Sequence, residues 1–324
     1  MPPTSTEPTH EYDHDVVIVG GGPTGCSAGV FCARDGLDTV IFDRGRSSIQ
    51  RCGHLENYLG FPAGIDIETF YDLLHDHAET AGCEIVPNLV ESVERTDDEA
   101  GFRVVPQEGD PVTARRVVAA TRYDGEYMRG LDDDAAMFET HEHDGEEHEY
   151  FTKDYADHDG TTPVERLYVA TPSDEDDQAI MAAGRGARVA RRVIADAKMD
   201  DGWWAEVAGG VDWVRQETKL DDEWADRDRW FEWFDDRYGE DAPVEPDTDR
   251  FERVREADID DSLSSYVSSD EIDRRAAAGQ EALAAHLDVD RIVAAVGAET
   301  LLEHLDDELI LERATDLNVA KVRE

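Results

Sequence analysis

Lysine is nearly absent from this 324-residue chain, and no basic run is present. The four lysines are Lys153, Lys198, Lys219 and Lys321. Against 31 Lys and Arg stand 78 Asp and Glu, so the formal net charge is −47. Because phosphate backbones attract stripes of Lys and Arg, this composition argues against nucleic acid and against an anionic membrane surface as partners.

Long apolar runs are missing as well. No segment approaches the roughly 18 consecutive apolar residues of a membrane span, and residues 1–14 contain no hydrophobic signal core. We therefore expect a cytoplasmic protein whose residues 1–13 form a disordered tail. Its negative charge must lie on the surface, where molar salt would screen the self-repulsion, so the composition predicts adaptation to salt.

Cysteine is scarce and lacks motif spacing. The four cysteines are Cys26, Cys32, Cys52 and Cys83. No Cys-x-x-Cys is present, so the sequence predicts neither a redox dithiol nor a zinc knuckle. The histidines among the carboxylates of residues 141–158 have no specific metal-binding spacing, and we predict no metal site.

Apolar patterning predicts an α/β fold. A continuous apolar run at 15–19 suits a buried parallel strand, and a helix over 23–35 with a second strand at 39–42 completes a β-α-β unit. A helix is predicted at 66–81. Short β-like runs follow at 84–86, 89–95, 101–105, 116–121 and 166–170, and a long helix at about 176–198.

Composition divides the chain into domains. Residues 14–199 are predicted to form the α/β domain, with an acidic insert at about 122–163 that contains a low-complexity patch at 139–149. All six tryptophans lie beyond residue 200, and we predict a helical C-terminal domain over 200–324. Aromatic residues recur at helical spacing from Trp224 to Tyr238, which predicts core packing, with a docking surface as the alternative.

One glycine-rich turn carries chemistry. Its residues are Gly20, Gly21, Gly22, Pro23, Thr24 and Gly25. They contain G-x-G-x-x-G directly after a predicted strand and at the start of a predicted helix, which is the context of a dinucleotide site. Gly20 would permit the tight turn, Gly22 would let the backbone approach a pyrophosphate, and Gly25 would let the helix pack on the strand.

Asp43 follows the second strand, 18 positions beyond Gly25. A carboxylate there can accept hydrogen bonds from ribose hydroxyls, and it argues against a 2′-phosphate on that ribose. The alternative is a glycine-rich turn in an ordinary α/β protein.

At this point the chain resembles the flavin-binding domain of the thioredoxin reductase family. The resemblance rests on residues 15–36 with Asp43, on the block 54–62, which reads HLENYLGFP, and on residues 116–121 and 167–190. It implies a Rossmann-type FAD-binding domain, a parallel sheet with helices plus a small β-meander, and FAD as the cofactor. The composition itself is of the haloarchaeal type.

The resemblance also implies where the cofactor lies. The glycine turn would hold the pyrophosphate, Asp43 the adenosine ribose, and the helix start at Gln178 and Ala179 would face the isoalloxazine. The candidate cofactor-binding residues are Gly20, Gly21, Gly22, Pro23, Thr24, Gly25, Asp43, Arg44, Asn57, Thr121, Gln178 and Ala179.

The chain departs from the family pattern in three respects. Only about 45 residues separate the strands at 117–121 and 167–170, whereas a β-α-β unit alone needs roughly 30 or more, so a complete NAD(P)H domain does not fit. The family's Cys-x-x-Cys is absent. The Gly-Asp expected after Ala170 reads Thr171-Pro172, which leaves open whether FAD is bound.

We therefore predict an FAD-dependent oxidoreductase that is reduced by a separate protein or by transiently bound NAD(P)H. One alternative is a non-catalytic FAD- or nucleotide-binding module. Another is a single-domain enzyme that uses one bound dinucleotide, similar to thiazole synthases. No catalytic acid, base or nucleophile is predicted, and an electron-donor protein or a homo-oligomer through the C-terminal helices is the protein partner to test.

Overall fold

The computed structural model describes residues 12–322 apart from six short gaps. The gaps are residues 98–99, 123–124, 144–145, 175–177, 210–212 and 221–222. Most of the predicted tail, residues 1–11, lies outside the described residues. Contacts divide the chain into two compact units, Met1–Asp273 and Arg274–Glu324. The domain boundary near residue 200 stays a prediction.

Five parallel strands form the centre of the first unit. They are β1 (His14–Val19), β2 (Thr39–Phe42), β3 (Glu84–Val86), β6 (Val112–Ala120) and β9 (Leu167–Thr171), in the order β3-β2-β1-β6-β9. Every residue of β2 and β9 is buried, which accounts for sequences that are apolar except for Thr39 and Thr171 at their ends. Because the strands are parallel, their carboxyl ends meet at one edge of the sheet.

The long strand β6 changes partner along one side. Its first three residues, Val112 to Ala114, pair antiparallel with Val104 to Phe102 of β5 (Phe102–Pro106). Strand β5 in turn pairs antiparallel with β4 (Val90–Arg95). From Val117 onward the same side of β6 pairs with β9 instead. The predicted β-meander is thereby confirmed, and it shares a strand with the parallel sheet.

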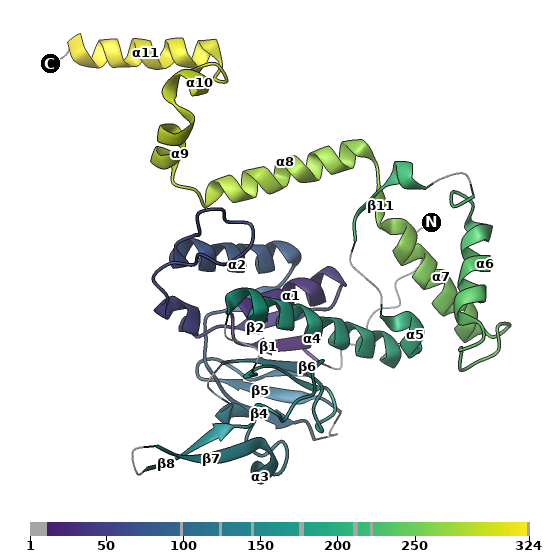
Figure 1. The fold of residues 1–324 in the computed structure, drawn as a ribbon. Coiled ribbons are helices and arrows are strands. Elements are labelled where there is room, and N and C mark those ends of the chain that lie inside the picture. The colour runs from purple at the N-terminus through teal and green to yellow at the C-terminus, as the bar shows by residue number, and fades with distance from the viewer. Residues whose placement is uncertain are drawn as a thin grey trace. The chain divides into compact units, whose positions relative to one another are not determined.

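Two apolar clusters cover the two faces of the sheet, because successive strand residues point to opposite faces. Val17 and Val19 of β1 belong to one cluster, and its other two buried residues belong to the second. Helices α1 (Pro23–Arg34), α2 (Ile67–Ala81) and α4 (Ala179–Asp200) lie on one side of the sheet in Figure 1. The meander and the acidic insert lie on the other side.

Glycines set how closely α1 packs. A Cβ on Gly25 would lie 1.8 Å from the carbonyl oxygen of Gly20. A Cβ on Gly186 of α4 would lie 2.1 Å from the carbonyl oxygen of Thr24. The backbones of α1, its preceding turn and α4 are therefore in direct contact. Side chains at these positions would separate the two helices.

The acidic insert has more structure than its composition predicts. It contains η2 (Glu126–Met128), α3 (Asp134–Met137) and a hairpin of β7 (Phe138–His143) and β8 (Glu146–Phe151). The low-complexity composition of residues 139–149 thus occurs on two paired strands, β7 and β8, in the part of this segment that the structure describes. Only the end pair Phe138 and Phe151 is apolar, with ring centroids 5.7 Å apart, so the sequence lacks the alternation that identifies a strand.

The described elements within residues 201–267 contribute the buried side chains of a third apolar cluster. Its elements are α5 (Ala205–Ala208), β10 (Arg215–Gln216), η3 (Glu217–Lys219), α6 (Arg227–Tyr238), α7 (Asp249–Ser264) and β11 (Tyr266–Val267). Trp230 and Phe234 are buried in it, and the ring of Trp204 stacks on Phe251 at 5.7 Å. The prediction that the aromatic stripe forms core is confirmed.

The remaining elements are helical. They are α8 (Ser269–Ala285), α9 (Val289–Val296), α10 (Ala298–Leu302) and α11 (Asp307–Val322). No residue of α8, α9 or α10 is buried in the part of the chain that the structure describes. The predicted fold class, an α/β domain with a parallel sheet and a meander followed by helical residues, is confirmed.

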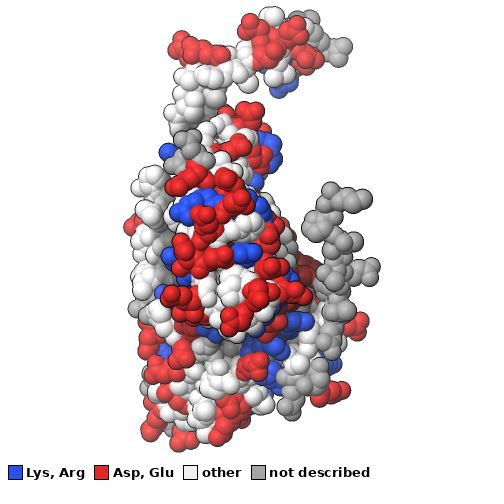
Figure 2. All heavy atoms as spheres, turned by 90° about the vertical axis from the view of Figure 1, so that its right-hand side faces the viewer, with Lys and Arg blue, Asp and Glu red and all other residues white. Residues whose placement is uncertain are grey.

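Charge lies on the surface, as the composition requires. Figure 2 shows Asp and Glu spread over one face of the molecule, with Lys and Arg scattered between them. Ion pairs link exposed side chains, among them Arg227 of α6 with Glu256 and Asp260 of α7. Such exposed pairs contribute little individually.

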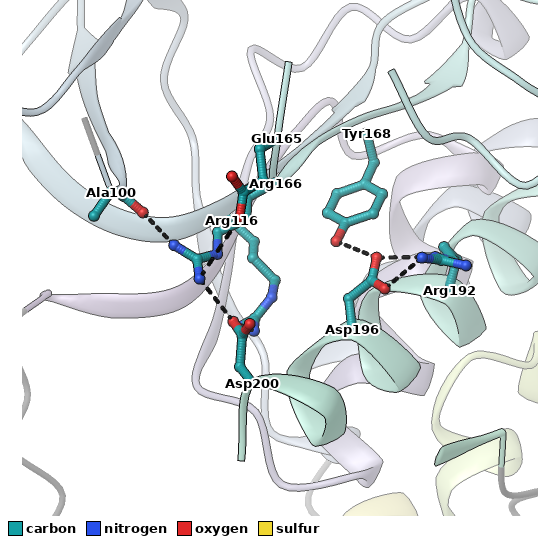
Figure 3. Close-up of polar contacts among 8 residues, drawn as sticks. All are labelled: Ala100, Arg116, Glu165, Arg166, Tyr168, Arg192, Asp196 and Asp200. Atoms are coloured by element: carbon teal, nitrogen blue, oxygen red, sulfur yellow. Dashed lines mark hydrogen bonds and ion pairs between the residues drawn. The ribbon is translucent and has the colours of Figure 1, made fainter. Parts of the chain in front are cut away.

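A polar network ties the C-terminal half of α4 to the sheet (Figure 3). Arg116 of β6 is 2% exposed and donates to Asp200 at 2.6 Å, and Arg166 lies 3.2 Å from the same carboxylate. One turn earlier, Asp196 accepts a hydrogen bond from the Tyr168 hydroxyl and pairs with Arg192. These contacts fix the position of α4 relative to β6 and β9.

Substituting Gly186 by alanine tests the contact between α1 and α4. We expect Gly186→Ala to lower the free energy of unfolding by about 2–3 kcal/mol, because backbone must shift to admit the Cβ. Gly184→Ala is the matched control on the same helix, where nothing lies within 4 Å, and it should stabilise by about 0.5–1 kcal/mol. Urea unfolding in molar KCl measures both, and equal midpoints would contradict the packing argument.

Removing the charge of Asp200 tests the network in Figure 3. Asp200→Asn leaves the buried Arg116 guanidinium and the neighbouring Arg166 guanidinium without the carboxylate that they share, so we expect a loss of about 3 kcal/mol in unfolding free energy. Asp201→Asn, one position later and exposed, should change stability by less than about 0.5 kcal/mol. Thermal unfolding of the two variants, measured side by side, tests whether Asp200→Asn lowers stability more than Asp201→Asn does.

Candidate functional site

A cavity of about 200 Å³ opens at the carboxyl edge of the parallel sheet. It is lined by residues that end or follow β1, β2, β3, β6 and β9, together with the starts of α1 and α4. Ligands of open α/β sheets bind at this edge. Ten of the twelve candidate residues line the cavity: Gly20, Gly21, Gly22, Pro23, Thr24, Asp43, Arg44, Thr121, Gln178 and Ala179.

The glycine turn has the geometry that its sequence predicts. Gly20 has φ +115°, and a Cβ there would lie 2.5 Å from the carbonyl oxygen of Ala120. Gly22 is the N-cap of α1, and a Cβ on it would lie 2.7 Å from the Ser47 hydroxyl. Gly25 lies behind the cavity wall, against the backbone of Gly20. The turn therefore presents bare backbone to the cavity.

Two helix N-termini point to the same cavity. Pro23 and Thr24 of α1 and Ala179 of α4 line it, and Gln178 is the N-cap of α4. Helix N-termini carry unpaired N–H groups and a partial positive charge, which favours anions. Asn57 does not line the cavity, but its Nδ2 donates to Oε1 of Gln178 at 2.5 Å and so contacts the wall from behind.

The Asp43 carboxylate is 94% buried and makes several hydrogen bonds. Its Oδ1 accepts from the N–H of Gly45 at 3.1 Å, and its Oδ2 accepts from the Tyr71 hydroxyl at 2.5 Å. Nε2 of His75 lies 3.3 Å from the same Oδ2. Burial alone would raise the pKa of Asp43, but the hydrogen bonds from His75, Tyr71 and Gly45 outweigh it and hold the pKa below its usual value.

Tyr71 and His75 come from α2 and were missed by sequence reasoning. Asp66 caps this helix by accepting from the N–H of Thr69 at 2.8 Å, and the two rings lie one turn apart with centroids 4.4 Å apart. Nε2 of His75 is also 3.0 Å from the carbonyl oxygen of Gly21. Their i, i+4 spacing beside the apolar face was the available signal, since it places both toward the sheet.

Arginines make the cavity wall positive. Arg44, Arg46, Arg51 and Arg122 line it, and Asp43 is its one carboxylate among the described residues. Only Arg44 was a candidate from sequence. A stretch with three arginines and no acid between residues 44 and 51 was the missed signal in so acidic a chain. A positively lined cleft concentrates anions.

The insert also contributes to the wall through Tyr127. Its hydroxyl lies 3.1 Å from that of Thr121, and both residues line the cavity. Thr171, at the position where the family resemblance expects the Gly-Asp pair, lines the cavity at the end of β9. Residues 88–90, which follow β3, complete that side.

Neither cysteine near the turn has the features of a nucleophile motif. The Cys26 thiol donates to the carbonyl oxygen of Gly21 at 3.2 Å, and burial raises its pKa well above the usual value. Cys52 is exposed and lines the cavity. Among the described residues no group of three or more His, Cys, Asp and Glu side chains could hold a metal ion. Within the same residues no helix has the length and apolar character to cross a membrane.

Comparison with known families and proteins supports the predicted resemblance. Residues 13–52 match the family model described as an FAD binding domain. The chain is 31% identical over 128 residues to the bifunctional thioredoxin reductase/thioredoxin of Mycobacterium leprae, covering 39% of this chain and 27% of that protein. It is 30% identical over 114 residues to the thioredoxin reductase of Bacillus subtilis, covering 35% of each. These matches confirm the resemblance, and FAD as the expected cofactor is supported by the matching family model.

Solved structures of similar fold include a thioredoxin reductase from Gloeobacter violaceus. It is 18% identical, with a TM-score of 0.47, and the match covers 64% of this chain and 99% of that one. A thioredoxin reductase of T. acidophilum is 19% identical, with a TM-score of 0.45, and 58% and 100% are covered. In the curated relatives the matched segments span only about a fifth to a third of the proteins' own length.

The contact between His75 and Asp43 predicts a pH-dependent stability. The hydrogen bond to Asp43 raises the pKa of His75 against an opposing effect of burial, so its stabilisation is present below the unfolded value of 6.5 and is lost as pH rises through the folded value. Replacing His75 by glutamine should therefore cost most near about pH 5–6, and the cost should shrink toward about pH 8.

Unfolding midpoints of wild type and His75→Gln across this pH range measure the effect. His77→Gln is the matched control, because His77 is exposed on the same helix. A difference between wild type and His75→Gln that stays constant with pH would show that the ion pair does not form.

Proposed function

We propose that the chain binds FAD in this cavity and acts as the flavin domain of a thioredoxin reductase-like oxidoreductase. The observation that carries the proposal is the convergence of a bare glycine turn, two helix N-termini and four arginines on one cavity at the carboxyl edge of the sheet. That combination suits a diphosphate flanked by a nucleoside.

The residues present fit the cofactor. Gly20–Thr24 would hold the pyrophosphate, because the turn lines the cavity and a Cβ at Gly20 or Gly22 would collide with Ala120 or Ser47 of the same wall. Asp43 would accept a hydrogen bond from the adenosine ribose, and Gln178 and Ala179 would approach the isoalloxazine at the start of α4. The arginines offset the repulsion between an anionic ligand and a chain of net charge −47.

FAD, when bound, supplies the electron-transfer chemistry, and the protein supplies binding and electrostatics. The N-terminus of α4 favours negative charge on whatever lies against it. Within these 324 residues there is no Cys-x-x-Cys, and the described residues between β6 and β9 hold a short helix and a hairpin. We therefore propose that electrons come from a separate protein or from transiently bound NAD(P)H. The cytoplasmic location and the adaptation to salt stay predictions from composition.

A specific observation favours a second candidate, a non-catalytic FAD-binding module. The titratable groups on the described wall, apart from arginines, are the Asp43 carboxylate, the Cys52 thiol and the Tyr127 phenol. The carboxylate is already hydrogen-bonded to Tyr71 and His75, so it is poorly suited to acid–base chemistry. The single-dinucleotide enzyme similar to thiazole synthases stays a hypothesis.

Spectroscopy of the protein purified in molar KCl tests the proposal. We expect a flavin spectrum, or FAD uptake by the colourless protein. Gly22→Ala should weaken FAD binding by about tenfold or more, because its Cβ would lie 2.7 Å from the Ser47 hydroxyl and would force the turn or Ser47 to move on the cavity wall. Gly53→Ala, beside the cavity with nothing within 4 Å of its Cβ, is the control.

Reduction of the bound FAD tests the catalytic candidate. Bleaching of bound FAD by NADH or NADPH would support the oxidoreductase, whereas FAD that only dithionite reduces would favour the binding module or an enzyme that needs a partner. A folded protein that takes up no FAD would overturn both.

A further inference from the structure

The C-terminal unit, Arg274–Glu324, has helices but no apolar core among its described residues. None of the apolar clusters of the described chain includes a residue beyond Tyr266, and no residue of α8, α9 or α10 is buried. Helix α9 has eight residues, three of them valine, and α10 has five. Isolated helices shorter than roughly 12–15 residues are marginal in water, because most helical stability comes from packing an apolar face. These helices therefore need a surface that covers them.

Large apolar side chains are concentrated on this unit. Of the fifteen that are strongly exposed among the described residues, nine lie here: Leu283, Leu287, Val289, Val293, Val296, Leu302, Leu305, Leu309 and Leu311. Val289, Val293 and Val296 recur at helical spacing and form one stripe along α9. Nine side chains that are each about half exposed offer on the order of 800 Å², which is what one partner contributes to a standard protein–protein interface.

The charge of this unit suits contact with a copy of itself. Residues 274–298 comprise most of α8 and all of α9, and they contain three arginines and three carboxylates, so their net charge is zero. The whole chain has a net charge of −47, and like charge keeps such molecules apart. Two copies of a neutral apolar segment can meet without that repulsion.

The rest of the chain offers no matching apolar surface among its described residues. Its six strongly exposed large apolar side chains lie in four separate segments: Leu59, Tyr150, Ile180 with Met181, and Trp213 with Val214. Residues 1–273 also have a net charge of −42, against −5 for the C-terminal unit. Residues 1–11 contain one large apolar side chain, that of Met1, and so cannot supply the cover either.

We propose that two copies of the chain associate through α8, α9 and the leucines that follow them, so that this apolar surface of one copy covers the same surface of the other. In a two-fold dimer one patch faces itself, which requires a self-complementary surface, and an apolar segment without net charge meets that requirement. The carboxylates that follow residue 298 are screened in molar salt. The inference goes beyond the proposed function, because it does not involve the FAD cavity.

Sedimentation velocity of the full chain in molar KCl tests the association. We expect a dimer at micromolar concentrations of wild type. Val293→Glu combined with Val296→Glu should raise the dissociation constant of the dimer by about a hundredfold or more, because each copy would then bury unpaired carboxylates. Val214→Glu in the first unit is the matched control, since Val214 is 48% exposed and Val296 is 46% exposed, and it should leave the dimer unchanged.

Two results of this experiment would overturn the proposal. One is a wild type that stays monomeric at every concentration up to about 100 μM. The other is a dimer that survives the double substitution, because the contact would then lie on another face.

Hydrogen exchange locates the contact without any substitution. The amides of α9 should be protected where the dimer forms and should lose that protection when wild type is diluted below the dissociation constant. The amides of α1 in the sheet domain are the control and should not change. Protection of α9 that does not depend on concentration would contradict the proposal, because the helix would then be covered within one copy. Fast exchange of α9 at concentrations where a dimer is present would contradict it too.

The exchange measurement stands even if the double variant does not fold. Neither experiment uses FAD, so failure of the dimer leaves the proposed function untouched, and a protein that takes up no FAD leaves the dimer untouched.

Discussion

The site depends on backbone contact between two helices that are distant in sequence. Gly186 of α4 lies against the carbonyl of Thr24 in α1, and Gly25 of α1 lies against the turn that precedes it. Both helices begin at the same edge of the sheet because each follows a parallel strand, and the absence of side chains between them lets the two starts lie close together. Two sets of unpaired N–H groups thereby face one cavity, which neither helix could achieve alone.

Electrostatics reinforces this arrangement. The molecule is strongly acidic overall, yet the described wall of the cavity has four arginines and one carboxylate. The local charge of the described wall therefore has the opposite sign to the net charge of the whole protein, which favours an anion in the cavity. Screening by salt reduces the long-range repulsion while the contacts inside the cavity are affected less.

Much of the fold was predictable because its signals are local. The apolar runs of β1, β2 and β9 and the glycine turn identified the parallel sheet and the cavity edge. The hairpin of β7 and β8 was not predictable, since its strands are polar apart from Phe138 and Phe151. Tyr71, His75 and Arg122 were missed for another reason: their role appears only when separate segments meet around Asp43 and the turn. The contact of Asn57 with the cofactor stays a prediction, and the structure shows its amide hydrogen-bonded to Gln178 of the cavity wall.

The cations on the described cavity wall are all guanidinium groups, and none is an amine. A guanidinium does not lose its proton in proteins, so the wall keeps its positive charge in alkaline brine as well as in neutral buffer. It also cannot form a Schiff base with a carbonyl compound, as a lysine would. Acylating reagents aimed at amines would leave the described cavity wall chemically unchanged, since no lysine lines it.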